Sequence, residues 1–362
     1  MTAPAVRPGI LEITPYVGGD SAIPGFDRAI KLASNEGALG PSPLAVAALR
    51  DSAGSIHRYP DGECIALREA LANHYGLEAA QIVCGAGSDE IIGFLARAYA
   101  GPGDEVLYTR HGFLMYPIAA KAAGATPVTA PETDLTADVD ALLDTVTPRT
   151  RIVFLANPNN PTGSYLPVAE LSRLRAGLPE DVLLVIDAAY AEYMSRNDYD
   201  PGIALVDGGA NVVMTRTFSK IFALGGARLG WAYCPPAIAD VINRVRNPFN
   251  VAAPSQAAGI AALSDVAFAD RSRVHNDRVL AWTTERLRAL GLTVPPSFGN
   301  FVLARFSEET GRDAAAADAF LKSHGIIVRR VAGYGLPESL RITIGLDDEM
   351  QAVVDTLAEF LG

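Results

Sequence analysis

The amino-acid sequence predicts an α/β protein: a large domain with a mostly parallel central sheet flanked by helices, a smaller α+β domain and an N-terminal arm. Short apolar runs alternate with helical patterns through the first two thirds of the chain. Continuous apolar strands separated by helices are typical of a parallel sheet that is covered on both faces. Near Pro254 this alternation gives way to a long helical stretch and then to a few strands.

The expected boundaries follow these changes in pattern. The chain has 362 residues, and one domain takes roughly 150 residues, so two domains are expected. We expect the arm over residues 1–28 and the large domain over residues 54–254. The small domain is expected to combine residues 29–53 with residues 255–362.

The predicted elements can be read in order along the chain. The strands of the large domain are residues 81–84, 105–109, 126–129, 151–155, 182–186, 212–215 and 229–234, with helices over 89–100 and 113–123. In the small domain, residues 255–290 are helical and long enough for two or three helices. Strands follow over 300–306, 326–330 and 340–344, and helices over 313–324 and 347–361.

The charge balance and the cysteines argue against several classes of protein. The chain has 30 basic and 41 acidic residues, whereas nucleic-acid binding requires a concentrated basic face. Small anionic substrates remain compatible, because a few well-placed arginines bind them. The three cysteines, Cys64, Cys84 and Cys234, cannot form a closed set of disulfides and favour a reducing cytoplasm. No apolar run approaches the ~20 residues of a membrane helix, and the start of the chain lacks a signal-peptide pattern.

A glycine motif follows the first predicted strand. Gly85 and Gly87 precede Ser88 at the start of a helix. Backbone N–H groups at a helix N-terminus bind phosphate well when no side chain shields them. The motif is not a dinucleotide fingerprint, because Glu90 stands where the third glycine belongs, and it is not a Walker A loop. Taken alone, it could equally be an ordinary strand–helix turn.

Two further strand ends carry polar groups. Residues 157–163 read Asn-Pro-Asn-Asn-Pro-Thr-Gly and follow the strand 151–155, at the end where open α/β sheets place ligands. These residue types also favour turns, but the asparagine amides are good donors to a phenolate or a carboxylate. Asp187 directly follows the strand 182–186. Its carboxylate is expected to be partly buried and to need a partner, either a cationic ring nitrogen or an arginine.

Lysine is scarce, which narrows the search for a reactive amine. The four lysines are Lys31, Lys121, Lys220 and Lys322. Of these, only Lys220 lies just beyond a predicted core strand, in a loop of small residues. A lysine that is desolvated near a cation loses its proton readily and forms Schiff bases. Arg228 could hold a phosphate there and also lower the pKa of Lys220.

These four strand ends supply a phosphate site, amide donors, a buried carboxylate and an isolated lysine. Pyridoxal phosphate needs that combination of groups. No metal site is expected, because the five histidines are scattered and lack the spacing of ligands. The G-x-S-x-G elbow of serine hydrolases is also absent from the sequence.

Motifs spread over nearly the whole chain carry a family resemblance. They are Thr14-Pro15-Tyr16, residues 31–36, Tyr59-Pro60-Asp61-Gly62, Gly87-Ser88-Asp89-Glu90, residues 157–163, Asp187 with Tyr190, and residues 216–220, 335–337 and 340–345. The chain resembles the fold-type I, class-II aminotransferases, and among them the histidinol-phosphate aminotransferase family. The resemblance implies the fold-type I fold, pyridoxal 5′-phosphate and a homodimer. It also implies transamination between L-histidinol phosphate and 2-oxoglutarate in histidine biosynthesis, which gives imidazole-acetol phosphate and L-glutamate.

The resemblance also implies a role for each matching residue. Lys220 would bind the cofactor covalently and shuttle a proton, Asp187 would hold the pyridinium nitrogen, and Tyr190 with Asn160 would bond the cofactor's O3′. Further cofactor contacts would come from Gly87, Ser88, Asp89, Phe113, Ser219 and Arg228, and from Tyr59 of the neighbouring subunit. The substrate would be bound by Tyr16, Asn35, Asn160, Arg329 and Arg341.

Departures from the family pattern and several alternatives remain. The chain differs at Gly37-Ala38, Ala188 and Ala227, and none of these changes removes a proposed catalytic group. The change at residues 37–38 touches the substrate entrance. Aromatic amino acid aminotransferases and threonine-phosphate decarboxylases resemble the chain closely as well. A non-catalytic pyridoxal-binding protein is a further alternative, against which the intact Lys220 counts.

Overall fold

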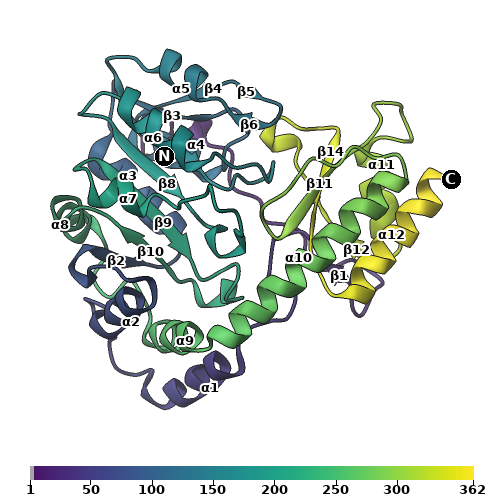
Figure 1. Cartoon of the computed structure of the whole chain (residues 1–362), viewed down its shortest axis with the longest axis horizontal. Helices are drawn as coiled ribbons and strands as arrows, with labels where there is room; N and C mark the ends of the chain where they lie inside the picture. Colours follow the sequence, from purple (N-terminus) through teal and green to yellow (C-terminus); the bar gives the residue numbers. More distant parts are fainter. Residues whose placement is uncertain (1–3) are drawn as a thin grey trace.

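The computed structural model describes residues 4–362, which form a large and a small lobe (Figure 1). The large lobe contains a seven-stranded sheet in the order β2-β10-β9-β8-β7-β3-β4. Its strands are β2 (Ile82–Gly85), β3 (Glu105–Thr109), β4 (Thr126–Ala130), β7 (Thr150–Ala156), β8 (Leu183–Asp187), β9 (Val212–Thr217) and β10 (Gly230–Tyr233). Strand β10 runs antiparallel to β2 and β9, and the other neighbouring pairs are parallel. The predicted mostly parallel sheet is confirmed.

Both faces of this sheet are covered by helices. Successive side chains of a strand point to opposite faces, so Ile152 and Val153 of β7 belong to two different apolar clusters. One cluster includes side chains of α3 (Ser88–Tyr99), α4 (Met115–Ala123) and α8 (Pro236–Val245). The other includes side chains of α2 (Ile65–Tyr75), α5 (Val139–Thr145), α6 (Val168–Gly177) and α7 (Ile203–Asp207). Burial on both faces explains why the strands read as continuous apolar runs.

The small lobe combines short strands with three helices. An antiparallel sheet has the order β11-β14-β13, with β11 (Phe301–Arg305), β14 (Ser339–Thr343) and β13 (Arg329–Arg330). Strand β1 (Ile30–Lys31) pairs in parallel with β12 (Ile326–Ile327). Helices α10 (Val266–Ala289), α11 (Ala314–Ser323) and α12 (Asp347–Leu361) complete the lobe. The predicted strand 326–330 is therefore two strands, because its two ends pair with different partners.

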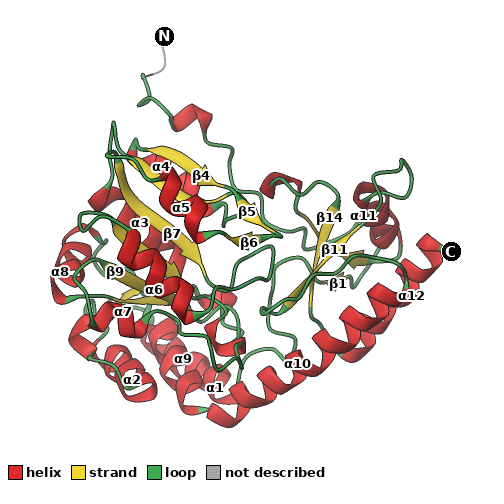
Figure 2. Cartoon of the chain, turned by 45° about the horizontal axis from the view of Figure 1, so that its top comes forward, coloured by secondary structure: helices red, strands yellow, loops and turns green. Residues whose placement is uncertain are grey.

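The helical stretch predicted over 255–290 is divided at Asp265. Helix α9 (Ala253–Ser264) ends there, and the Asp265 carboxylate caps α10 by accepting a hydrogen bond from the Phe268 N–H group. Figure 2 shows α10 running from beside α9 in the large lobe toward α12 in the small lobe. The long helix thus links the two lobes.

Two helices that were expected in the small domain pack against the large lobe. Helix α1 (Pro43–Ser52) and α9 contact each other, and Ala45, Ala258 and Ala262 belong to the core beneath the seven-stranded sheet. The predicted boundaries assigned both helices to the small domain. Their small apolar residues indicate burial but do not indicate the surface that covers them. We propose that the large domain begins near residue 43 and includes α9.

The remaining described elements are short and connect the main ones. They are β5 (Glu132–Thr133), β6 (Thr136–Ala137), η1 (Ile10–Glu12), η2 (Ala53–Ser55), η3 (Ala79–Gln81), η4 (Ala191–Tyr193), η5 (Gly225–Ala227) and η6 (Ala332–Tyr334). Within residues 4–362, no helix is both long enough and apolar enough to cross a membrane.

Candidate active site

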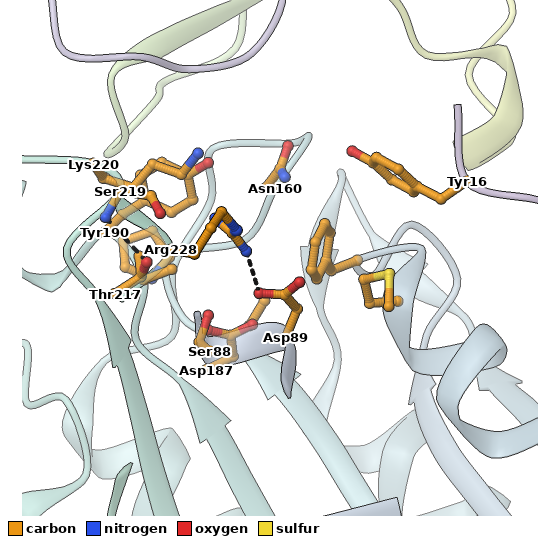
Figure 3. A pocket seen from close by; sticks show the side chains of 15 residues that line it. Tyr16, Ser88, Asp89, Asn160, Asp187, Tyr190, Thr217, Ser219, Lys220 and Arg228 are labelled. Carbon is orange, nitrogen blue, oxygen red and sulfur yellow. Dashed lines mark hydrogen bonds and ion pairs between the residues drawn. The ribbon is translucent and has the colours of Figure 1, made fainter. Parts of the chain in front are cut away.

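A cavity of about 290 Å³ opens where the central strands of the large sheet end. Strands β7, β8 and β9 end at Ala156, Asp187 and Thr217, and all three residues line it. The other lining residues are Tyr16, Ser88, Asp89, Phe113, Met115, Pro158, Asn160, Ala189, Tyr190, Ser219, Lys220 and Arg228 (Figure 3). The parallel order of the strands brings their carboxyl ends, and the loops that follow them, to one edge of the sheet.

Lys220 lies in the loop that follows β9. Its Nζ atom is 3.4 Å from the backbone oxygen of Ser34 and 5.9 Å from the centre of the Tyr190 ring. Burial and, next, the nearby Arg341 guanidinium lower the pKa of Lys220 to about 8. Arg228, which the sequence suggested for this effect, contributes less than Arg341. A useful fraction of the amine is therefore unprotonated near neutral pH, as a nucleophilic lysine requires.

Asp187 is the last residue of β8, and it is buried. Its carboxylate accepts hydrogen bonds from the Tyr116 hydroxyl at 2.9 Å and from the Thr215 hydroxyl at 3.4 Å. Burial raises the pKa of Asp187 to about 6, and the two hydroxyl donors act in the opposite direction. These hydrogen-bond partners are neutral hydroxyls rather than an arginine. A cationic group in the cavity would therefore stabilise the ionised form of Asp187.

The start of α3 and Arg228 form one corner of the cavity. Gly87 precedes the helix with a φ of 98°, and a Cβ atom at this position would lie 2.5 Å from Nη2 of Arg228. The backbone conformation favours glycine, and a side chain here would also displace the ends of Asp89 and Arg228. Arg228 also pairs with Asp89 at 2.8 Å. Glu90, which occupies the position of the missing third glycine, accepts a hydrogen bond from the Ala86 N–H group at 2.7 Å and so fixes the loop.

Polar and aromatic groups face this corner across the cavity. Asn160 accepts a hydrogen bond from Arg341 through Oδ1 at 2.5 Å, which leaves its amide nitrogen to donate. Tyr190 is almost fully buried. Phe113 and Tyr16 also line the cavity, and Figure 3 shows Tyr16 approaching from the N-terminal arm. A flat aromatic ring could thus be held between Phe113 and polar groups.

Two predicted substrate residues lie behind the cavity wall. Asn35 is 1% exposed, and its amide nitrogen donates a hydrogen bond to the Tyr190 hydroxyl oxygen at 2.8 Å. Arg341 is 5% exposed, and its Nη2 group donates a hydrogen bond to the backbone oxygen of Ala33 at 2.7 Å. The Nε atom of Arg341 is buried without a hydrogen-bond partner in the part of the chain that the structure describes.

Two further predicted residues lie away from the cavity in this chain. Arg329 lines a neighbouring cavity formed partly by the arm, and it donates a hydrogen bond to the backbone oxygen of Val17 at 2.6 Å. Its guanidinium is 6.0 Å from the centre of the Tyr16 ring. Tyr59 is 83% exposed and stacks on Phe249. Tyr59 is not among the residues that line the cavity.

Several residues of the site were not predicted from the sequence. Tyr116 is the most important of them, because its buried hydroxyl contacts Asp187 directly. Its position within α4 looks like that of an ordinary core aromatic residue, and no local signal distinguishes it. The other missed residues are Met115, Ala156, Pro158, Ala189, Thr215 and Thr217. Pro158 and Thr217 lie within the motifs 157–163 and 216–220, and the other four lie within two residues of a residue that had been singled out. Proximity to those motifs was the only available signal.

The residues present fit pyridoxal phosphate. A lysine amine with a lowered pKa and a buried carboxylate line the same cavity. The glycine before α3 leaves room that a Cβ atom would fill, next to Arg228. These groups match three parts of the cofactor: the lysine amine its aldehyde, the carboxylate its ring nitrogen, and the start of α3 with Arg228 its phosphate.

Comparison with known proteins agrees with this geometry. The family described as "Aminotransferase class I and II" matches residues 27–357. The chain belongs to this aminotransferase family. The predicted family and fold class are thereby confirmed.

Relatives of this aminotransferase cover its whole length. It is 66% identical to a histidinol-phosphate aminotransferase of Paramagnetospirillum magneticum, with 100% of both chains covered. It is 62% identical to a histidinol-phosphate aminotransferase of Rhodospirillum centenum, over 100% of this chain and 99% of the relative. A crystal structure of histidinol-phosphate aminotransferase from Sinorhizobium meliloti, in complex with pyridoxal-5′-phosphate, is 31% identical. It has a TM-score of 0.90 and covers 99% of this chain and 98% of its own.

Proposed function

We propose that this aminotransferase uses pyridoxal 5′-phosphate to interconvert L-histidinol phosphate and 2-oxoglutarate with imidazole-acetol phosphate and L-glutamate. This reaction belongs to histidine biosynthesis. The cofactor assignment depends mainly on one observation: Lys220 and Asp187 line the same cavity, and the start of α3, preceded by Gly87, lies beside them. The full-length relatives named histidinol-phosphate aminotransferase support the substrate.

The buried acid and base of the cavity have complementary tasks. When bound, pyridoxal phosphate supplies an electron sink for negative charge that develops at Cα of the amino substrate. Asp187 holds a proton on the ring nitrogen, because a buried carboxylate with only hydroxyl partners favours a cation beside it. Lys220, as a neutral amine beside the cofactor, would accept the proton that leaves Cα of the amino substrate and would donate it again as the reaction proceeds. The hydroxyls of Tyr116 and Thr215 keep the Asp187 carboxylate in place.

The remaining groups bind and orient. The N–H groups at the start of α3, the Ser88 and Ser219 hydroxyls and Arg228 would hold the phosphate of the cofactor. Phe113 would stack against the ring. Asn160 and Tyr190 would contact its O3′ oxygen.

The substrate phosphate has two candidate arginines in the small lobe. Arg341 lies behind Asn160, and Arg329 lies beside Tyr16 of the arm. Histidinol phosphate has no α-carboxylate, so its phosphate is its main anionic group. A phosphate can accept two guanidinium groups at once, whereas one satisfies a carboxylate. We therefore propose that both arginines bind the phosphate, with Tyr16 alongside.

Steady-state kinetics with histidinol phosphate, phenylalanine and tyrosine tests the substrate assignment. We expect the highest kcat/KM for histidinol phosphate. Replacing Arg329 with alanine should weaken the transition state for histidinol phosphate more than that for glutamate, by roughly 1.5–3 kcal/mol for a lost charge-assisted bond. Arg330→Ala is the matched control, since Arg330 is the exposed neighbour in β13. A preference for phenylalanine or tyrosine, with equal and small effects of Arg329→Ala on both donors, would favour an aromatic amino acid aminotransferase instead.

We also propose that the enzyme is a homodimer in which Tyr59 enters the partner's site. Large apolar side chains are exposed close to this residue in the sequence, and Phe249 stacks on its ring. Ile56 is 72% exposed, and Ile65 and Phe249 are about half exposed. Such a patch is typical of a protein–protein interface.

Subunit mixing tests this arrangement. Lys220→Ala and Tyr59→Ala homodimers should each be strongly impaired. A mixed dimer should recover activity, because one of its two sites then has both native residues. The control is a mixture of Lys220→Ala and Asp187→Ala subunits. If Lys220 and Asp187 act in the site of their own subunit, each site of this mixed dimer lacks one of them, and activity should not recover. Absence of recovery in the first mixture would contradict the shared site.

A cytoplasmic location is proposed as well. Cys64, Cys84 and Cys234 are buried and free, as expected for a protein kept in a reducing compartment. Cell fractionation tests it directly.

A further inference from the structure

A chain of buried hydrogen bonds connects the small lobe to the cavity. The backbone N–H group of Asn35 donates to the Thr343 hydroxyl oxygen at 2.9 Å, and the Thr343 hydroxyl donates to Oδ1 of Asn35 at 3.1 Å. The amide nitrogen of Asn35 then donates to the Tyr190 hydroxyl oxygen at 2.8 Å. All three residues are at most 3% exposed. The chain ends at Tyr190, which lines the cavity.

These contacts set the direction in which the Tyr190 hydroxyl hydrogen can point. Thr343 has one hydroxyl hydrogen, and its donation to Oδ1 turns the oxygen of the Asn35 amide away from Tyr190. The amide nitrogen therefore faces Tyr190, whose oxygen must accept. The hydrogen of Tyr190 is left for an acceptor elsewhere. If the Asn35 amide were rotated by 180°, its oxygen would accept a hydrogen bond from the Tyr190 hydroxyl. Tyr190 could then only accept, and not donate, a hydrogen bond in the cavity.

The surroundings hold this arrangement in place. Asn35 has a left-handed backbone, with a φ of 53°. The amide nitrogen of Asn300 donates to the backbone oxygens of Asn35 and Glu36, both at 3.0 Å. Phe301 lies opposite Thr343 in the β11–β14 register and packs edge-on against the Tyr190 ring, with centres 5.4 Å apart. The segment that bears Asn35 is thus tied to the small sheet on which Thr343 sits.

We propose that Thr343 is a positioning residue that acts through Asn35 to direct the Tyr190 hydroxyl hydrogen into the cofactor cavity. The inference rests on the proposed function, because the acceptor in the cavity would be the phenolic oxygen of pyridoxal phosphate. A hydrogen bond donated to an ionised oxygen stabilises the ionised form and lowers its pKa. Thr343 does not touch the cavity itself, yet it influences the proton affinity of the cofactor.

The test is a pH titration of the visible absorbance of the bound cofactor. Thr343→Val keeps the shape of the side chain and removes the hydroxyl, and Thr343→Ser restores the hydroxyl. We expect Thr343→Val to move the titration midpoint toward higher pH by about one unit, because a donor to an ionised oxygen is lost. Thr343→Ser should titrate as the native protein does. Thr283→Val is the matched control, because Thr283 is fully buried and its hydroxyl has no partner among the described residues.

A second substitution separates positioning from general disturbance. In a Tyr190→Phe background, Thr343→Val should shift the midpoint no further, since the two act through one hydroxyl. The charged and titratable groups around Tyr190, namely Lys220, Asp187, Arg341 and Tyr334, are unchanged in all these variants. Thermal unfolding identifies any variant that is misfolded, and Thr343→Ala then replaces Thr343→Val.

The outcomes are distinct. An unchanged midpoint in Thr343→Val and Thr343→Ala, or equal shifts with and without the Tyr190 hydroxyl, would overturn the positioning role. If the native protein mixed with pyridoxal phosphate shows no visible absorbance band at any pH, it does not bind the cofactor through Lys220, and the proposed function fails before any variant is compared. If the band is present but does not change with pH in the native protein or in Thr343→Val, the positioning role is overturned while the proposed function stands.

Discussion

Replacing Lys220 with alanine is expected to abolish turnover while leaving pyridoxal phosphate binding detectable. The substitution removes the only lysine that lines the cavity among the described residues. The start of α3, Arg228 and Asp187 all remain, so the phosphate and the ring nitrogen keep their partners. Turnover and equilibrium dialysis of the cofactor measure the two properties separately. Lys322→Ala is the control, because its ion pairs with Asp20 and Asp318 belong to the arm and α11.

The pKa of Lys220 adds a pH dependence to this prediction. A lowered pKa means that the neutral amine predominates above about pH 8. Labelling of the cofactor-free protein by a small neutral aldehyde, trapped with borohydride, should therefore rise as the pH rises through about 8 and level off above it. Peptide mapping locates the label, with Lys31 and Lys121 as internal comparisons. A label found mainly on those lysines would overturn the assignment of Lys220.

Asp187→Ala is expected to lower kcat by at least about two orders of magnitude, the scale of a preorganised electrostatic partner. Without the carboxylate, the ring nitrogen loses the group that keeps it protonated. Asp187→Glu should keep part of the activity, since the charge remains but its position changes. Steady-state and single-turnover rates measure the effect on the chemical step.

Tyr116→Phe provides a matched comparison for Asp187. It removes one hydroxyl donor to the carboxylate and keeps the ring, which stacks on Phe154 with centres 4.7 Å apart. We expect a loss clearly smaller than that of Asp187→Ala. Near-native kcat in Asp187→Ala would mean that the carboxylate serves the fold rather than the reaction.

Much of the large lobe could be predicted because its signals are local. Strand β3 has the predicted bounds, and β4, β7 and β9 each extend the prediction by one or two residues. Strands β3, β7 and β9 are buried along nearly their whole length, so the apolar part of each sequence has a clear end. Strand β4 lies at the edge of the sheet and is only partly buried. The polar residue that follows such a run lies at the edge of the sheet, where ligands bind. Asp187, Asn160 and Lys220 were found in this way.

Residues whose contacts join positions far apart in the sequence could not be predicted in this way. Tyr116 contacts Asp187 across 71 positions of the sequence, and Thr343 contacts Asn35 across 308. The period of a helix or strand tells which face is buried, but not which residue lies opposite. The same reason explains the placement of α1 and α9, whose apolar residues pack under the large sheet.

The sequence by itself thus determined the kind of fold, the positions of the main strands along the chain and the reactive groups at or after the ends of β2, β7, β8 and β9. These features depend on residue types at short spacings, where backbone geometry leaves few choices. Only the tertiary structure decided that Arg341 lies close enough to lower the pKa of Lys220, that hydroxyls are the partners of Asp187, and that Asn35 faces Tyr190 rather than the cavity. The contacts of Arg341 and Asn35 depend on how the small lobe meets the large one, whereas Tyr116 and Thr215 reach Asp187 from α4 and β9 of the same lobe. In each case the partners are distant in the sequence, and no local pattern brings their side chains together.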